Sequence, residues 1–134
     1  MLQLMSLTYT SVARPGLEPA DVRDIHQTAR HLNALDGVTG LLVYNGHKFL
    51  QVIEGAENAI DDLLQRLQAD PRHVSLTVED RRIIERREFQ HWAMELAEIG
   101  IGDDKAQSDL SALLPATFPA AIRAQIVELL QTRP

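Results

Sequence analysis

Three polar side chains stand at positions where the sequence pattern gives them a possible chemical role. Gln51 lies in the middle of the apolar segment Phe49–Ile53, Tyr9 lies near the end of a first predicted strand, and Asn33 lies at the end of a first predicted helix. A buried primary amide needs partners for two N–H donors and a carbonyl, and leaving them unmade costs about 1–3 kcal/mol. We therefore expect a ligand site around Gln51.

Gln51 belongs to a β-hairpin that the pattern predicts over residues 37–55. Two segments of alternating strand-like residues are separated by Asn45-Gly46, which is the strongest short-range signal for a two-residue type I′ turn. This turn would place Gly40 opposite Gln51, and the missing side chain at Gly40 would leave room for a flat ligand. Both faces of the hairpin are apolar, so other elements must cover both of them.

Each of these residues also has a purely structural interpretation. Tyr9 could be a core tyrosine with a satisfied hydroxyl, Asn33 a helix C-cap and Gln51 a residue at the rim of the core. In the fold predicted below, the first and third strands are commonly neighbours at the sheet centre, which would bring Tyr9 and Gln51 within hydrogen-bonding distance. Trp92 and Met94, on one face of the last predicted strand, are more often core residues than cofactor contacts.

The composition excludes several classes of protein. The chain has 134 residues, which suits one domain with a proper core. A net charge of −6 argues against a nucleic-acid surface, and no apolar segment is long enough for a membrane span. The absence of cysteine excludes disulfides, thiolate metal sites and cysteine nucleophiles. With an N-terminus that lacks the features of a signal peptide, this composition predicts a cytoplasmic protein.

No catalytic motif is present in the sequence. The five histidines are scattered, and none pairs with a carboxylate at the spacing of a known metal site. There is no glycine-rich phosphate loop and no Gly-x-Ser-x-Gly elbow. We therefore expect a protein that is not an enzyme and holds no metal.

The hydrophobic periodicity predicts five strands and four helices. Residues recurring at helical spacing mark two amphipathic helices, and Pro19 suits the first turn of the first one. The basic residues Arg81, Arg82, Arg86 and Arg87 are interpreted as a connecting loop. The predicted elements are a strand over 2–10, a helix from 19 to about 33, the hairpin, a helix from 56 to about 69, a strand from 74 that could continue to 84, a strand over 89–99, and helices over 109–114 and 119–130.

This order predicts an α+β fold with a ferredoxin-like β-α-β-β-α-β core and a fifth strand. Right-handed crossovers place both inner helices on the same face of the sheet, so the second apolar face requires the C-terminal helices. We therefore divide the chain into a ligand-binding domain over residues 1–100 and a C-terminal helical extension over residues 101–134, with a role in output or oligomerisation.

From Leu4 to Leu96 the chain resembles the BLUF domains, a family of blue-light sensors that use a flavin. Any one of the matching motifs is weak, but the ordered set is highly specific. The motifs are Tyr9-Thr10-Ser11, Asn33 four residues before Gly37-Val38-Thr39-Gly40, Phe49-Leu50-Gln51-Val52-Ile53-Glu54-Gly55, Asp70-Pro71-Arg72-His73, and Phe89-Gln90-His91-Trp92-Ala93-Met94.

The resemblance implies a role for each matching position. Tyr9 corresponds to the photochemical tyrosine and Gln51 to the glutamine between that tyrosine and the flavin ring. Asn33 would hold the polar edge of the ring. The remaining implied residues are Ile25 and Leu67, which would sandwich the ring, Arg66, Arg72 and His73, which would approach the phosphates, and Trp92 and Met94, which would respond to light. Leu32 departs from the family, because many members have a polar ring contact there.

The resemblance also implies the function. Light would drive electron and proton transfer from Tyr9, leave Gln51 rotated or tautomerised, and give a reversible red-shifted state without a covalent bond. The cofactor would be FAD, with FMN as the alternative. The signal would pass through the fifth strand and the C-terminal helices to a separate partner protein, and the chain would form a homo-oligomer. The rival functions are a light-inert ferredoxin-like ligand-binding module and a small ferredoxin-like enzyme.

Overall fold

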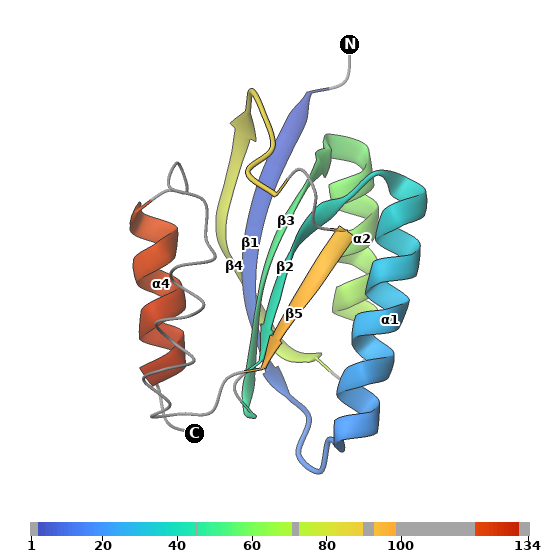
Figure 1. Ribbon diagram of the computed structural model, residues 1–134, viewed down its shortest axis with the longest axis vertical. Helices are drawn as coiled ribbons and strands as arrows, with labels where there is room; N and C mark the ends of the chain where they lie inside the picture. The colour runs from blue at the N-terminus through green and yellow to red at the C-terminus, as the bar shows by residue number, and fades with distance from the viewer. Residues whose placement is uncertain (1–2, 45, 71–72, 90–92, 99–119, 132–134) are drawn as a thin grey trace.

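The computed structural model describes residues 3–44, 46–70, 73–89, 93–98 and 120–131. In these ranges the chain forms five strands and three helices, coloured from blue to red along the chain in Figure 1. Their bounds are β1 Leu4–Ala13, α1 Pro19–Asp36, β2 Thr39–Tyr44, β3 Lys48–Ala56, α2 Glu57–Ala69, β4 His73–Ile84, β5 Ala93–Glu98 and α4 Ala120–Gln131. No helix within the described ranges is both long and apolar enough to cross a bilayer.

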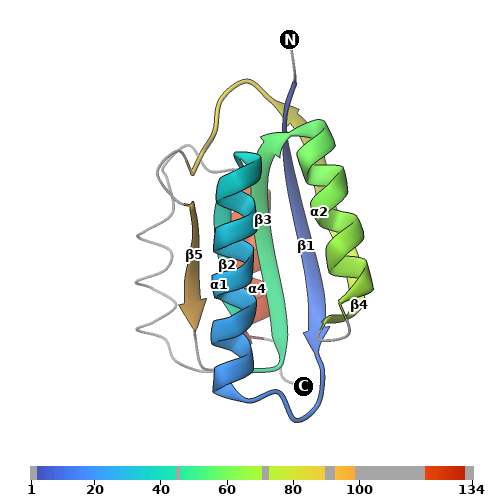
Figure 2. The same ribbon diagram turned by 90° about the vertical axis from the view of Figure 1, so that its right-hand side faces the viewer.

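The strands form one sheet in the order β4-β1-β3-β2-β5. Neighbouring strands are antiparallel except for β2 and β5, which are parallel. Helices α1 and α2 cover one face of the sheet and α4 lies against the other (Figures 1 and 2). This arrangement confirms the predicted ferredoxin-like core, its additional strand and the placement of helices on both faces.

The face under α1 and α2 carries the larger part of the core. Strand side chains alternate between faces, so the odd-numbered residues of β1 point to the same side as Gln51 and Ile53 of β3. Ile25 of α1 and Ile60 and Leu63 of α2 are buried against this side. Burying each such side chain contributes about 1.5–3 kcal/mol, so the apolar stripes hold both helices on the sheet.

The opposite face is closed by the C-terminal helix. Leu41 and Val43 of β2 and Leu50 and Val52 of β3 have almost no exposed surface, and Ile122 of α4 is buried as well. The apolar second face of the hairpin thus has the helical cover that the sequence predicts for it. The predicted helix over 109–114 lies outside the described residues.

The hairpin register differs from the prediction by two residues. The last pair before the connection is Tyr44 with Phe49, so the loop is longer than a two-residue type I′ turn. Gln51 is therefore opposite Leu42, and Gly40 is opposite Ile53. Because strand side chains have a period of two, a shift by two residues leaves every side chain on its predicted face.

Gly40 is therefore glycine for a different reason from the predicted one. A Cβ atom at this position would overlap the backbone carbonyl of Val52 on the neighbouring strand. The absent side chain thus permits close approach of two backbones, and it does not make room opposite Gln51.

Three predicted boundaries also require correction. Helix α1 continues past Asn33 to Asp36, and Gly37 follows it with a φ of +69°, the left-handed conformation common after a helix C-terminus. Arg81 and Arg82 are not in a loop, because β4 extends to Ile84. The last strand is described over Ala93–Glu98, and Phe89, its predicted first residue, is not in a strand.

Candidate ligand-binding site

The centre of the sheet brings two of the predicted polar residues into direct contact. Tyr9 of β1 and Gln51 of β3 are cross-strand partners, and the Tyr9 hydroxyl donates a 2.6 Å hydrogen bond to Gln51 Oε1. Tyr9 has no exposed surface and Gln51 is 2% exposed. Directly opposed side chains on adjacent strands lie on the same face, so the β1–β3 register alone suffices to bring these two head groups together.

The surroundings of Tyr9 keep its hydroxyl protonated. Burial raises the pKa of Tyr9 far above its ordinary value of 10.0, and the negative charge of Asp70 raises it further. Both effects act in the same direction because a phenolate would be desolvated and would lie near another anion. Tyr9 is therefore a hydrogen-bond donor to Gln51 throughout the physiological pH range.

A cleft opens above this pair, with about 500 Å³ of empty space when the open solvent at its mouth is included. Its floor is the sheet, and its walls are α1 and α2, which Figure 2 shows side by side with β1 and β3 between them. The lining residues are Tyr9, Ile25, Thr28, Ala29, Leu42, Gln51, Leu63, Arg66, Leu67 and Asp70.

The two walls of the cleft are mainly apolar. Ile25 and Ala29 are one helical turn apart on α1, and Leu63 and Leu67 are one turn apart on α2. Residues four apart occupy the same face of a helix, so each helix presents a short apolar strip to the cleft. A flat, apolar ring system that needs polar contacts at one edge fits between such strips above the amide of Gln51.

Polar groups accompany this apolar slot. Arg66 of α2 contributes a guanidinium group, Asp70 contributes a carboxylate at the C-terminal end of α2, and Thr28 contributes a hydroxyl from α1. Thr28 and Asp70 are not among the site residues predicted from the sequence. Thr28 could have been found, because it is three residues after Ile25 and so lies on the same helix face. Asp70 belongs to the family motif Asp70-Pro71-Arg72-His73, but no pattern in the sequence assigns it a contact in the site.

The cleft unites five of the residues proposed as contacts from sequence, namely Tyr9, Ile25, Gln51, Arg66 and Leu67. The backbone of Asn33 lies in the last turn of α1, and His73 and Met94 lie in β4 and β5, but their side chains are outside the described residues. Arg72 and Trp92 are outside them entirely. Within the described part of the chain, no group of three metal-ligating side chains is found.

The fold and the cleft together define a class of protein. It is a ferredoxin-like module with a cleft between two helices, above a buried tyrosine–glutamine hydrogen bond. Comparison with known proteins identifies the family. Residues 4–95 match the model of the BLUF family, described as sensors of blue light using FAD.

Curated relatives agree with the family match. Over 95 residues the chain is 32% identical to photoactivated adenylate cyclase subunit beta of Euglena gracilis, an alignment that covers 70% of this chain and 11% of the relative. It is 30% identical over 73 residues to the blue light- and temperature-regulated antirepressor BluF of Escherichia coli K12, covering 54% and 18%. The matched region is thus a small part of these curated relatives.

Solved structures extend the agreement to nearly the whole chain. The dark-state structure of BlrB, a BLUF protein, superimposes with a TM-score of 0.74 at 33% identity and covers 97% of this chain and 96% of that one. A Klebsiella pneumoniae BlrP1 structure gives a TM-score of 0.79 at 26% identity, covering 95% and 32%.

The chain belongs to the BLUF family, and its BLUF domain is a blue-light sensor that uses a flavin. The described residues fit that cofactor. The helix walls are apolar where the ring faces would lie, and the floor has an amide and a hydroxyl where a heteroatom edge needs hydrogen bonds. Arg66 adds a positive charge for a phosphate-bearing tail.

Proposed function

We propose that the cleft between α1 and α2 binds the flavin non-covalently and that Tyr9 and Gln51 form its photochemical switch. The observation that carries this proposal is the buried 2.6 Å hydrogen bond from the Tyr9 hydroxyl to Gln51 Oε1 on the floor of the cleft. A tyrosine held protonated beside an amide that can change its hydrogen bonds is a group that can lose and regain a proton reversibly.

Different residues of the chain would contact different parts of the flavin. Ile25 and Leu67 would contact the two faces of the ring, and Gln51 and Asn33 would bond its polar edge. Arg66, with Arg72 and His73, would approach the phosphates. We propose FAD, which the family description names, as the natural cofactor, with FMN as the alternative, since a BlrP1 structure was solved with FMN.

When bound, the flavin supplies blue-light absorption and a one-electron acceptor. With the flavin bound, Tyr9 would be the residue that gives up an electron, and its hydroxyl proton would move along the hydrogen bond to Gln51 Oε1. Once Tyr9 had regained the electron and the proton, Gln51 would be left rotated or tautomerised. The amide then presents a different donor and acceptor pattern to the ring edge. This rearrangement persists until Gln51 relaxes thermally.

The output of this switch passes to β5 and to the C-terminal helical extension over residues 101–134. Support comes from the register, since Leu42 of β2 pairs with Gln51 on one side and with Leu96 of β5 on the other. Trp92 and Met94, next to and within this strand, would respond to the change. The chain itself acts as a sensor and not as an enzyme, and it forms a cytoplasmic homo-oligomer that controls a separate partner protein.

The visible absorption spectrum of the purified protein tests this proposal. We expect a structured flavin band in darkness that moves slightly to the red after blue light and returns in the dark. A stable flavin band without any shift would contradict the Tyr9–Gln51 switch. The absence of a flavin band, even after reconstitution with FAD or FMN, would contradict flavin binding by the cleft.

A further inference from the structure

Glu54 is a buried carboxylate that lies outside the ligand cleft. It follows Gln51 by three residues on β3, its side chain is on the opposite face of the sheet, and it is 1% exposed. Its Oε1 accepts a 2.7 Å hydrogen bond from the backbone N–H of Phe89, and its Oε2 accepts a 2.9 Å hydrogen bond from that of Glu88. One carboxylate therefore holds two successive backbone amides of the segment after β4.

Arg87 ties the same segment to the hairpin from a second direction. Its Nη1 donates a 2.8 Å hydrogen bond to the backbone carbonyl of Glu54 and a 3.0 Å hydrogen bond to Thr39 Oγ1. Thr39 is the cross-strand partner of Glu54. We call Thr39, Glu54 and residues 87–89 the Glu54 clamp, since together they join β2, β3 and the chain that leads to β5.

The chemistry of the clamp requires a carboxylate. Two neighbouring N–H groups aimed at one side chain need two acceptor atoms, and an ionised carboxylate is the side chain with acceptors only. A glutamine would turn an NH₂ group toward one of the two amides. Burial raises the pKa of Glu54, while the amides of Glu88 and Phe89 lower it, so hydrogen bonds offset part of the cost of a buried charge.

The clamp sits where β5 begins. Phe89 is buried, and β5 starts at Ala93, which pairs with Gly40, the residue next to Thr39. Figure 1 shows β5 running along β2 at the edge of the sheet. The first residue of β5 and residues 87–89 are thus both bonded to the hairpin that carries Gln51.

We propose that Glu54 is a positioning residue that fixes the start of β5 to β3, so that a rearrangement of Gln51 moves β5 and is not absorbed by the connecting segment. This inference rests on the proposed function of Gln51. It assigns Glu54 a role in transmission, distinct from ligand binding and from the photochemistry. A change at one site can move a distant element only if a rigid set of contacts connects the two, and here the clamp would connect the hairpin that carries Gln51 to β5.

The test compares Glu54→Gln with Glu79→Gln in the full chain loaded with FAD. Glu79 is an exposed glutamate on β4 that accepts a hydrogen bond from the Thr10 hydroxyl, so it controls for the loss of one sheet carboxylate. Trp92 is the one tryptophan in the sequence and directly precedes β5, so its fluorescence reports on that strand. The two light-dependent readouts are the flavin red shift and the change in Trp92 fluorescence.

In Glu54→Gln we expect a red shift of wild-type size and a change in Trp92 fluorescence that falls by more than half. Glu79→Gln should match the wild type in both. In darkness, the amides of Glu88 and Phe89 should exchange with solvent at least about tenfold faster in Glu54→Gln, because each has lost a charged acceptor. A purely structural role would change the dark exchange but leave the Trp92 response intact.

A full Trp92 response in Glu54→Gln, with the red shift present, would overturn the proposal. A wild-type protein without a red shift would instead contradict the proposed function, and dark exchange of the two amides would still report whether the clamp exists. If Glu54→Gln fails to fold, Thr39→Val provides the second variant, since it removes one acceptor of Arg87 and leaves the carboxylate in place. A wild-type Trp92 response in Thr39→Val would then count against the clamp.

Discussion

The chemistry proposed for this protein depends on one hydrogen bond, from the Tyr9 hydroxyl to Gln51. Each residue has an ordinary explanation by itself, because tyrosine is common in cores and a buried amide needs a partner. Their combination at the floor of a cleft is what makes a switch possible. Any change that removes the hydroxyl or the amide should therefore abolish the light response while leaving the apolar walls that we propose as the contacts of the flavin ring.

We expect Tyr9→Phe and Gln51→Leu each to retain flavin and to lose the reversible red shift. Neither change removes an apolar wall residue, and each removes one half of the hydrogen-bonded pair. Absorption spectra before and after a blue flash measure the outcome. Tyr44→Phe is the matched control, because the Tyr44 hydroxyl bonds the backbone of Gly46 and does not line the cleft. A normal photocycle in either cleft variant would contradict the mechanism.

The raised pKa of Tyr9 predicts how stability changes in alkali. An unfolded tyrosine ionises near pH 10, whereas the folded state holds the Tyr9 proton to higher pH because of burial and Asp70. Well below pH 10, Tyr9 is protonated in both the folded and the unfolded state and adds no pH dependence to the free energy of unfolding. Above about pH 10, the unfolded state releases a proton that the folded state keeps, so the free energy of unfolding falls as pH rises.

Tyr9→Phe has no hydroxyl to ionise at this position. The difference in free energy of unfolding between the wild type and Tyr9→Phe should therefore shrink between about pH 9 and about pH 11. Urea unfolding of both proteins across this range measures the difference. Tyr44 is the other tyrosine of the chain and is present in both proteins, so its titration cancels. A difference that stays constant with pH would show that Tyr9 ionises in the folded state as readily as in the unfolded chain.

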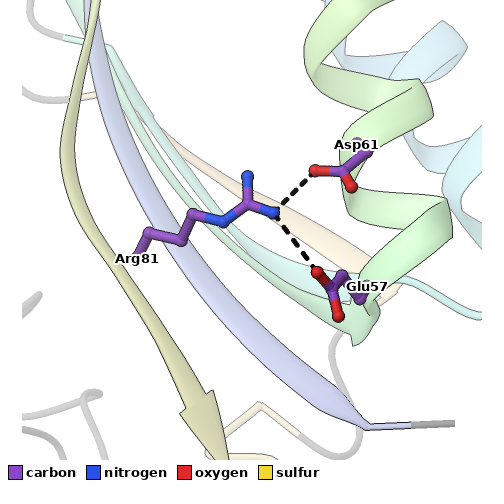
Figure 3. Close-up of polar contacts among 3 residues, drawn as sticks. All are labelled: Glu57, Asp61 and Arg81. Atoms are coloured by element: carbon purple, nitrogen blue, oxygen red, sulfur yellow. Dashed lines mark hydrogen bonds and ion pairs between the residues drawn. The ribbon is translucent and has the colours of Figure 1, made fainter.

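At the scale of elements, two kinds of contact hold α2 on the sheet. Ile60 and Leu63 are buried in the core. Arg81 of β4 forms ion pairs with α2, in which its Nη2 lies 2.8 Å from Asp61 Oδ1 and 3.9 Å from Glu57 Oε1 (Figure 3). The side chains of all three charged residues are more than a third exposed. Exposed ion pairs contribute about 0–1 kcal/mol, so the apolar contacts dominate.

We therefore expect Ile60→Ala to lower the free energy of unfolding by about 2–5 kcal/mol and Arg81→Ala by less than about 1 kcal/mol. The first change leaves a cavity under a helix wall of the cleft, and the second exposes two carboxylates to water. Chemical denaturation of the flavin-free protein compares them without a contribution from cofactor binding. Equal losses in the two variants would mean that the ion pair holds α2 as strongly as the core does.

At the scale of the whole molecule, the sheet separates two faces with different tasks. One face holds the cleft between α1 and α2, and the other is covered by α4 and includes the Glu54 clamp. The five-stranded sheet lies between the two faces, and none of the residues that line the cleft comes from α4. A disturbance of the α4 side should therefore leave the cleft intact while altering what the molecule presents to other proteins.

Ile122→Asp tests this separation. Ile122 is buried, so a carboxylate there should release α4 from the sheet and expose apolar surface of β2 and β3. We expect increased binding of a hydrophobic dye together with a flavin red shift of wild-type size. Ala124→Asp, on an exposed position of the same helix, is the control. Loss of the red shift in Ile122→Asp alone would show that the α4 face is required for the photochemistry.

Much of this architecture follows from local patterns. The stripes of α1 and α2 and the alternation of the strands predict which side chains are buried, because the periods of 3.6 and 2 are local properties of the chain. The predicted faces of the hairpin are correct although its predicted turn is wrong, since a shift by two residues preserves the alternation. The predicted partner of Gln51 within the hairpin is wrong, because the length of the turn depends on the packing of both strands as well as on Asn45-Gly46.

The fold class, the two apolar faces and the residue types available for a light sensor can be read from the amino-acid sequence. Which of these residues meet depends on the tertiary structure. Tyr9 and Gln51 are 42 residues apart and are joined by the β1–β3 register. Glu54 finds its partners 34 and 35 residues away, and they are backbone amides that carry no signal in the amino-acid sequence. Local propensity determines elements, whereas contacts between distant segments depend on how the whole chain packs.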